Sequence, residues 1–169
     1  MISLPVSSAL HPTRRVAYAV MLVAIGVALA PFTSFPIGIA KINPTQHFVN
    51  VLGAVLLGPG WAVLIAAVIG VIRNVMGVGT LLAFPGGMIG AFLAGLAYRW
   101  FRRAGLAALG EMVGTGVLAP VVSALVVAPF LMNTSIPLLA LVPSFLGSTV
   151  IGALLGVMAI RLLHKADII

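Results

Sequence analysis

The sequence predicts an all-α integral membrane protein, built as a bundle of six transmembrane helices. Of its 169 residues, 62% are hydrophobic and only 7% are charged, whereas about a quarter of the residues in a soluble domain are charged. Long stretches contain no Asp, Glu, Lys or Arg, at residues 16–40, 42–72, 74–98 and 112–160. Each stretch exceeds the roughly 20 apolar residues that cross a bilayer as a helix. We therefore expect residues 1–169 to form one multi-pass domain in the lipid bilayer of the cell membrane.

Proline and glycine residues divide these stretches into helices, because both interrupt the helical pattern. We expect helices at about residues 16–30, 45–57, 61–76, 80 or 84 to 98, 104–127 and 138–163. Pro31 is expected to end the first helix, and Gly58-Pro59-Gly60 to separate the second from the third. Pro120 lies inside the fifth helix and should kink it, since proline removes a backbone donor. The segment 31–44 between the first two helices, rich in proline and glycine, is expected to be a loop.

The basic residues predict the orientation of the bundle. If both termini are cytoplasmic, only Lys41 and Arg73 lie on the outer side. All the other basic residues then lie on the inner side, as the positive-inside rule predicts: Arg14, Arg15, Arg99, Arg102, Arg103, Arg161 and Lys165. An arrangement with five or seven helices would place Arg161 and Lys165 outside. The basic residues are too scattered to form a nucleic-acid-binding face, despite the net charge of +7.

The densest cluster of polar side chains is the segment KINPTQHFVN, residues 41–50. In the predicted topology it lies at the external end of the first hairpin and in the opening turns of the second helix. Gln46, His47 and Asn50 offer hydrogen-bond donors and acceptors to a solute arriving from outside. Alternatively, His47 is a helix-start histidine bonded to backbone. We expect no metal site and no cofactor, because no second histidine or carboxylate stands nearby at ligand spacing.

Polar groups within the hydrocarbon region are costly unless partnered, so each one is a candidate for function. Glu111 lies about seven residues into the fifth helix, and Thr115 one turn further along the same face. Asn50 is expected at a similar depth, and Arg73 closer to the outer surface, so we do not expect a direct Arg73–Glu111 ion pair. Two structural alternatives remain open. Glu111 could extend toward the arginines at the inner end of its helix, and Arg73 with Asn74 could cap the glycine-rich turn after the third helix.

Small residues form a second pattern on the first helix. Ala17, Ala24 and Ala28 share one face with Met21, and Ala24-xxx-Ala28 is a small-xxx-small pair that allows close approach of two helices in lipid. This face is the best candidate for binding a partner subunit. The alternative is packing within the bundle itself, since the chain has 19 glycines and several similar pairs.

The motifs of common enzyme classes are missing from the sequence. It contains no phosphate-binding loop of the P-loop or dinucleotide type. A Ser–His–acid set is not evident, because Glu111 and Asp167 are the only acidic residues. We therefore expect a binding protein rather than an enzyme, with a small structural or channel-forming membrane protein as the alternative from another class.

Three segments resemble the ThiW family: PIGIAKINPTQHFVNVLGAVLLGP (36–59), IRNVMGVGTLLAFPGGMIGA (72–91) and LGEMVGTG (109–116). The resemblance extends over residues 15–163. Members of this family are presumed substrate-binding S components of energy-coupling factor (ECF) transporters, assigned to the thiamine precursor hydroxyethylthiazole. The resemblance implies a six-helix bundle without an ATPase of its own. It also implies association with a membrane coupling subunit and two cytoplasmic ATPases.

The resemblance further implies a vitamin pocket near the outer face, beneath the loop between the first two helices. Coupling-subunit contact would use an AxxxA face of the first helix, which Ala24 and Ala28 match, Ala17 extends and Met21 interrupts. We expect the loop 31–46 to cap a pocket lined by the second, fourth, fifth and sixth helices. The expected ligand-binding residues are Gln46, His47, Asn50, Phe84, Glu111 and Thr115, with Phe84 or Phe48 stacking on the ring. Ser144 and Ser148 are weaker candidates. Thiamine itself, its pyrimidine half or another vitamin remains an alternative ligand.

Overall fold

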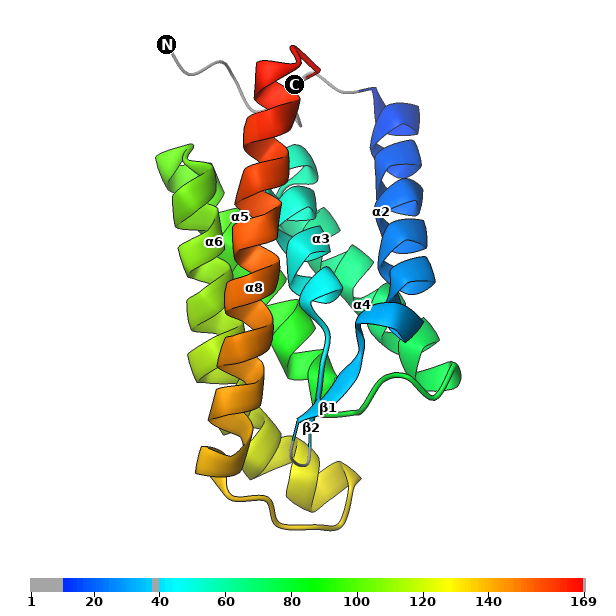
Figure 1. Cartoon of the computed structure of the whole chain (residues 1–169), viewed down its shortest axis with the longest axis vertical. Helices are drawn as coiled ribbons and strands as arrows, with labels where there is room; N and C mark the ends of the chain where they lie inside the picture. The colour runs from blue at the N-terminus through cyan, green and yellow to red at the C-terminus, as the bar shows by residue number, and fades with distance from the viewer. Residues whose placement is uncertain (1–10, 38–39, 169) are drawn as a thin grey trace.

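The computed structural model describes residues 11–37 and 40–168 and shows a bundle of helices with one short hairpin (Figure 1). Residues 1–10, 38–39 and 169, including two residues of the predicted loop, lie outside the described residues. The helical segments are α2 (Pro12–Thr33), α3 (Pro44–Leu57), α4 (Pro59–Val75), α5 (Ala83–Phe101), α6 (Ala104–Val113), η1 (Gly114–Leu118), α7 (Ala119–Val122), η2 (Ser123–Leu131) and α8 (Leu138–Lys165). Because α6, η1, α7 and η2 follow without a break, the described chain has six helical rods, which confirms the predicted number.

Three of the six rods are long and apolar enough to cross a membrane by length and composition. They are Pro12–Thr33, Ala104–Leu131 and Leu138–Lys165. Pro59–Val75 is apolar but shorter. The shortest rod is α3, whose first turns carry the polar cluster of the sequence.

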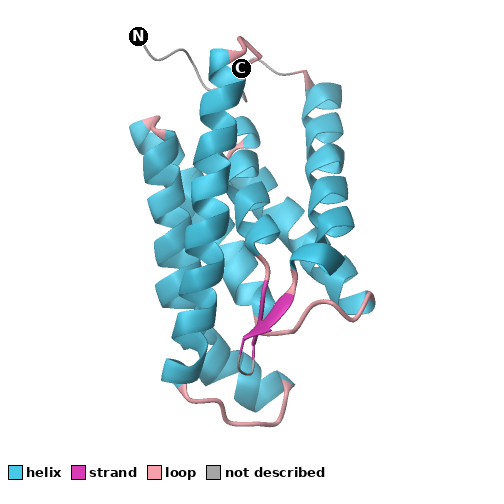
Figure 2. Cartoon of the chain, viewed as in Figure 1, coloured by secondary structure: helices cyan, strands magenta, loops and turns pink. Residues whose placement is uncertain are grey.

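The segment expected to be a loop contains a short β-hairpin, while the other elements of the described chain are helical, as predicted. Strand β1 (Phe35–Ile37) pairs antiparallel with β2 (Ala40–Ile42), and Pro36 stands opposite Lys41 (Figure 2). Each strand has three residues, too few for an alternating pattern to be visible in the sequence. A proline is tolerated here because neither strand has a second neighbour that needs its missing N–H.

Helix α3 lies at the centre of the bundle. It packs against α2, α4, α5, α6 and α8, and 12 of its 14 residues are buried. The side chain of Asn43 caps its first turn by accepting a hydrogen bond from the backbone N–H of Gln46 at 2.8 Å, and Pro44 occupies the first turn, where a missing N–H is harmless. Because α3 has no exposed face, the polar side chains at its start must point at other helices.

Several helix ends and one helix interior differ from expectation. Helix α2 continues through Pro31 to Thr33, so the missing N–H of this proline does not end the helix. The fifth rod continues to Leu131 instead of ending near residue 127. Within this rod η1 and η2 are π-helical, and Pro120 is the second residue after the end of η1. A wider helical turn is a common way to accommodate an interior proline.

Small residues serve two different purposes in the bundle. Gly26 is buried against Ile69 of α4, and Gly110 lies against the α5 backbone, where a methyl group would come within 2.5 Å of the Leu93 carbonyl oxygen. These glycines therefore pack within the bundle, as the alternative interpretation held. The predicted partner face is different, because Ala17, Ala24 and Ala28 are all exposed, and Met21 between them is 52% exposed.

The two ends of the bundle differ in charge. Figure 1 shows that α2 begins, α5 ends and α8 ends at the same end of the molecule, where all the basic residues of the predicted inner side lie. The hairpin and the start of α3 are toward the opposite end, together with Lys41 and Arg73.

Candidate functional site

A cavity opens at the hairpin end of the bundle, between β2, α3, α4, α5, η1 and α8. The space between its walls, including the open solvent at its mouth, measures about 400 Å³. Side chains from six elements and the turn before α5 line it: Lys41, Ile42, Asn43, Gln46, His47, Arg73, Thr80, Ala83, Gly86, Thr115, Ser144, Phe145 and Ser148.

Asn43 connects the hairpin to the rest of this wall. Its Nδ2 donates to Ser34 Oγ at 2.7 Å, and its backbone N–H donates to Ser148 Oγ of α8 at 2.9 Å. Beside it, the hydroxyl of Thr45 donates to Thr33 Oγ1 at 2.9 Å. These bonds attach the end of α2, the start of α3 and the middle of α8 to one another, so the hairpin is fixed over the cavity.

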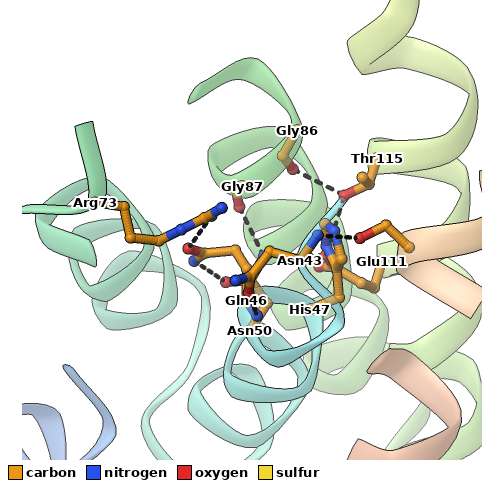
Figure 3. A network of polar contacts seen from close by, with 10 residues as sticks. Asn43, Gln46, His47, Asn50, Arg73, Gly86, Gly87, Glu111 and Thr115 are labelled. Atoms are coloured by element: carbon orange, nitrogen blue, oxygen red, sulfur yellow. Dashed lines mark hydrogen bonds and ion pairs between the residues drawn. The ribbon is translucent and has the colours of Figure 1, made fainter. Parts of the chain in front are cut away.

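Three side chains converge on one oxygen of Glu111 behind the cavity wall (Figure 3). His47 Nδ1 lies 2.8 Å from Glu111 Oε1, and Asn50 Nδ2 donates to the same oxygen at 3.0 Å. The hydroxyl of Thr115 lies 3.0 Å from this oxygen and 2.8 Å from the carbonyl of Gly86. Residues 61 and 64 positions apart in the chain thus meet within hydrogen-bonding distance.

The Glu111 carboxylate is completely enclosed. Its exposed fraction is 0%, and its second oxygen, Oε2, has no hydrogen-bond partner in the described structure. Gly90 of α5 makes this position possible, because a methyl group on Gly90 would lie 2.7 Å from both carboxylate oxygens. Any larger residue at position 90 would therefore displace the carboxylate.

A second polar chain runs from Asn50 toward α4. Asn50 Nδ2 also donates to the carbonyl of Gly87 at 3.0 Å, while its Oδ1 accepts from Gln46 Nε2 at 3.2 Å. Gln46 Oε1 in turn faces Arg73 Nη1 at 3.5 Å. Asn50 is therefore the residue that connects the Glu111 cluster to the Arg73 side of the cavity.

The structure brings together five of the six predicted ligand-binding residues. Gln46, His47 and Thr115 line the cavity, while Asn50 and Glu111 lie directly behind them and hold them in place. Ser144 and Ser148, the weaker candidates, also line the cavity.

The structural alternatives resolve differently for each residue. Glu111 does not extend toward the arginines at the end of its helix, because it is buried against His47. His47 bonds to this carboxylate through Nδ1 and not to backbone. Asn74 does order the turn after α4, by donating to the carbonyls of Gly70 and Thr80, whereas the side chain of Arg73 points into the bundle (Figure 3).

Phe84 is the one predicted site residue that is not at the cavity. Its ring lies against Gly70 of α4, where a methyl group would come within 3.1 Å of Cε1, because the glycine leaves a space on α4 that the ring fills. Phe48, the other predicted aromatic, packs against the apolar core. The aromatic residue that lines the cavity is Phe145 of α8.

Sequence reasoning also missed residues whose role depends on contacts. Asn43 had a detectable signal, since Asn before Pro is a typical helix start, but its bond to Ser148 spans 105 positions. Gly90 had none, because its importance arises from the carboxylate that packs on it.

The described residues contain no group of three or more His, Cys, Asp or Glu side chains that could hold a metal ion.

A second cavity lies at the opposite end of the bundle, between α3, α4 and α5, and measures about 540 Å³ with its open solvent included. Arg99 and Arg102 line it, beside Tyr98 and apolar residues. It lacks the convergence of buried polar side chains found at the hairpin end. The hairpin-end cavity is therefore the candidate binding site.

Comparisons with known proteins agree with this architecture. A family model described as "Thiamine-precursor transporter protein (ThiW)" matches residues 16–166. Among solved structures, the chain is similar to one described as "Structure and mechanism of the S component of a bacterial ECF transporter", with a TM-score of 0.76. The two chains are 16% identical, and the similarity covers 92% of this chain and 98% of that chain. At this identity the similarity shows a shared fold. No match was found among curated proteins.

The shared acceptor in this network gives a first prediction. Glu111→Ala removes the oxygen on which His47, Asn50 and Thr115 converge, leaving buried donors unmatched, so we expect a loss of about 2 kcal/mol or more in stability. Glu111→Gln keeps an acceptor oxygen and should lose less. Thermal unfolding of the purified protein in detergent measures both. Equal unfolding temperatures for the parent and Glu111→Ala would show that the network does not hold the helices together.

Proposed function

The chain belongs to the ThiW family of thiamine-precursor transporter proteins, and on this premise we propose that it is the substrate-binding S component of an ECF-type importer. The observation that carries the proposal is the hairpin-end cavity, where polar side chains from several helices converge within an S-component fold. Membership of a transporter family, together with multi-pass helices, also means that the chain is not an enzyme.

Hydroxyethylthiazole is the proposed core of the substrate. A thiazole alcohol is a small aromatic ring that needs an apolar slot, a stacking partner and a few hydrogen bonds. Phe145 offers an aromatic surface, and Gln46, His47 and Thr115 offer donors and acceptors on the facing walls. Asn50 and Glu111 act behind them by fixing their orientation. Thiamine itself is less well supported, since this cation would favour carboxylates, and none lines this cavity. The neutral pyrimidine half of thiamine is the competing ligand.

We propose that the hairpin end faces the outside of the cell and that both termini are cytoplasmic. The support is the charge difference between the two ends, because basic residues are retained on the cytoplasmic side. The cavity then opens toward the side from which a nutrient arrives.

Partner binding is proposed at the exposed face of α2. Ala17, Ala24 and Ala28 cover no other described helix, and small residues allow close helix–helix contact in lipid. The proposed partner is the membrane coupling subunit, which in turn would bind two cytoplasmic ATPases. A small structural or channel-forming protein is the competing function, and it predicts no saturable ligand binding.

Ligand binding by the purified chain tests the proposal directly. Hydroxyethylthiazole should bind saturably in isothermal titration calorimetry, and His47→Ala or Asn50→Ala should weaken binding about tenfold or more, because each leaves a polar group unmatched. His11→Ala is the matched control, since His11 is exposed at the opposite end of the bundle. A folded protein that binds no thiamine precursor would favour the structural or channel alternative. Full affinity in both variants would place the site elsewhere.

Cysteine labelling tests the orientation, because the natural chain has no cysteine. Single cysteines at positions 13 and 166, at the start of α2 and just after α8, should both react only with a reagent admitted to the cytoplasm. A cysteine at position 133, in the loop at the hairpin end, should react from outside. Positions 13 and 166 labelled from opposite sides would contradict the six-helix topology.

Bulky substitutions test the partner face. Ala24→Leu with Ala28→Leu should block co-purification with the coupling subunit and abolish uptake, because the two helices can no longer approach closely. Ligand binding by the isolated chain should be unchanged, since Ala24 and Ala28 are exposed and do not line the cavity. Val20→Leu, also exposed on α2, is the control. Normal co-purification of the double variant would exclude this face.

A further inference from the structure

Arg73 is a buried cation that the chain does not neutralise. Its side chain is only 2% exposed, and Nε has no hydrogen-bond partner in the described structure. The two contacts of its guanidinium are long and go to neutral groups, Gln46 Oε1 at 3.5 Å and Ser34 Oγ at 3.4 Å. A guanidinium has five N–H donors, so these contacts orient the group but leave its charge and most of its donors unused.

No acidic side chain of this protein is available to Arg73. The chain has only two acidic residues, Glu111 and Asp167. Among the described residues the single ion-pair contact is between His47 and Glu111, and Asp167 follows α8 at the opposite end of the bundle (Figure 1). The counter-charge of Arg73 must therefore come from outside the chain.

The cavity wall is positively charged on the Arg73 side. Arg73 and Lys41 both line the cavity, and no Asp or Glu does. Lys41 Nζ donates to the backbone carbonyl of Gly77 at 2.8 Å, a neutral acceptor that leaves the ammonium charge uncompensated. Hydroxyl groups of Thr80, Ser144 and Ser148 line the same space. This is a donor-rich and cationic surface, and it suits an anion better than a neutral alcohol.

We propose that Arg73, assisted by Lys41, forms an anion-binding subsite of this cavity, so that the transported precursor carries an oxyanion group on the thiazole side chain. The proposal rests on the proposed function and narrows its substrate class. A phosphate monoester and a carboxylate share the required chemistry, because both present oxygens at the spacing of the guanidinium fork. A neutral hydroxyl supplies one acceptor and no charge, so it leaves a buried cation unpaired inside the membrane protein, an unfavourable state.

Calorimetric titration of the purified full chain tests the subsite with three probes: hydroxyethylthiazole, its phosphate ester and a thiazole carboxylic acid. We expect at least one anionic probe to bind tenfold or more tightly than the alcohol, and the two anionic probes identify which oxyanion is preferred. Arg73→Gln should weaken the preferred anionic probe at least tenfold, and by a clearly larger factor than it weakens the alcohol. Arg73→Lys should keep part of the preference, since it retains the charge without the planar fork.

Two controls make the test decisive. Arg161→Gln removes an exposed arginine at the opposite end and should leave all three affinities unchanged. If Arg73→Gln does not fold, Lys41→Gln should still reduce the anionic preference in a folded protein. Equal or tighter binding of the alcohol by the parent would overturn the subsite while leaving the proposed function intact. If no probe binds to folded parent protein, the proposed function fails and the subsite with it.

Discussion

The hairpin end of the bundle depends on one carboxylate oxygen. Glu111 Oε1 lies within hydrogen-bonding distance of His47 and Asn50 of α3 and of Thr115 of η1. Gly90 of α5 leaves the space that the carboxylate occupies. Three separate helices are thereby held at a fixed separation behind the cavity. In a bundle stabilised by apolar contacts alone, helices could rotate with little penalty, whereas a buried acceptor shared by several donors permits one arrangement.

The position of α3 explains why its polar residues can be functional. An outer helix would turn such residues toward lipid, where unpartnered polar groups are strongly unfavourable. With 12 of its 14 residues buried, α3 instead directs them at α4, α5 and α6. Asn43 then extends the network to the hairpin and to Ser148, so the cover of the cavity and its floor belong to one hydrogen-bonded unit.

The two buried charges of the bundle have different roles because their surroundings differ. Glu111 lies behind the wall and is surrounded by donors of the chain itself. Arg73 lies in the wall and is surrounded by neutral acceptors at long distances. The first charge is held by the fold through one of its two oxygens and acts as structure. The second charge is neutralised only by an anion that enters the cavity. This is why we assign substrate recognition to Arg73.

Composition and helix breakers are sufficient to predict the six rods, their approximate limits and the asymmetry of charge, since these depend on hydrophobic length, proline and the bilayer. The same reasoning named Gln46, His47, Asn50, Glu111 and Thr115 as site residues and placed Asn50 at a depth similar to that of Glu111. It could not predict that His47 and Glu111 touch, that Phe145 lines the cavity while Phe84 fills the space at Gly70, or that a short hairpin covers the site. Helix periodicity fixes which residues share a face, but the rotation of each helix against its neighbours is decided by packing between residues far apart in the chain.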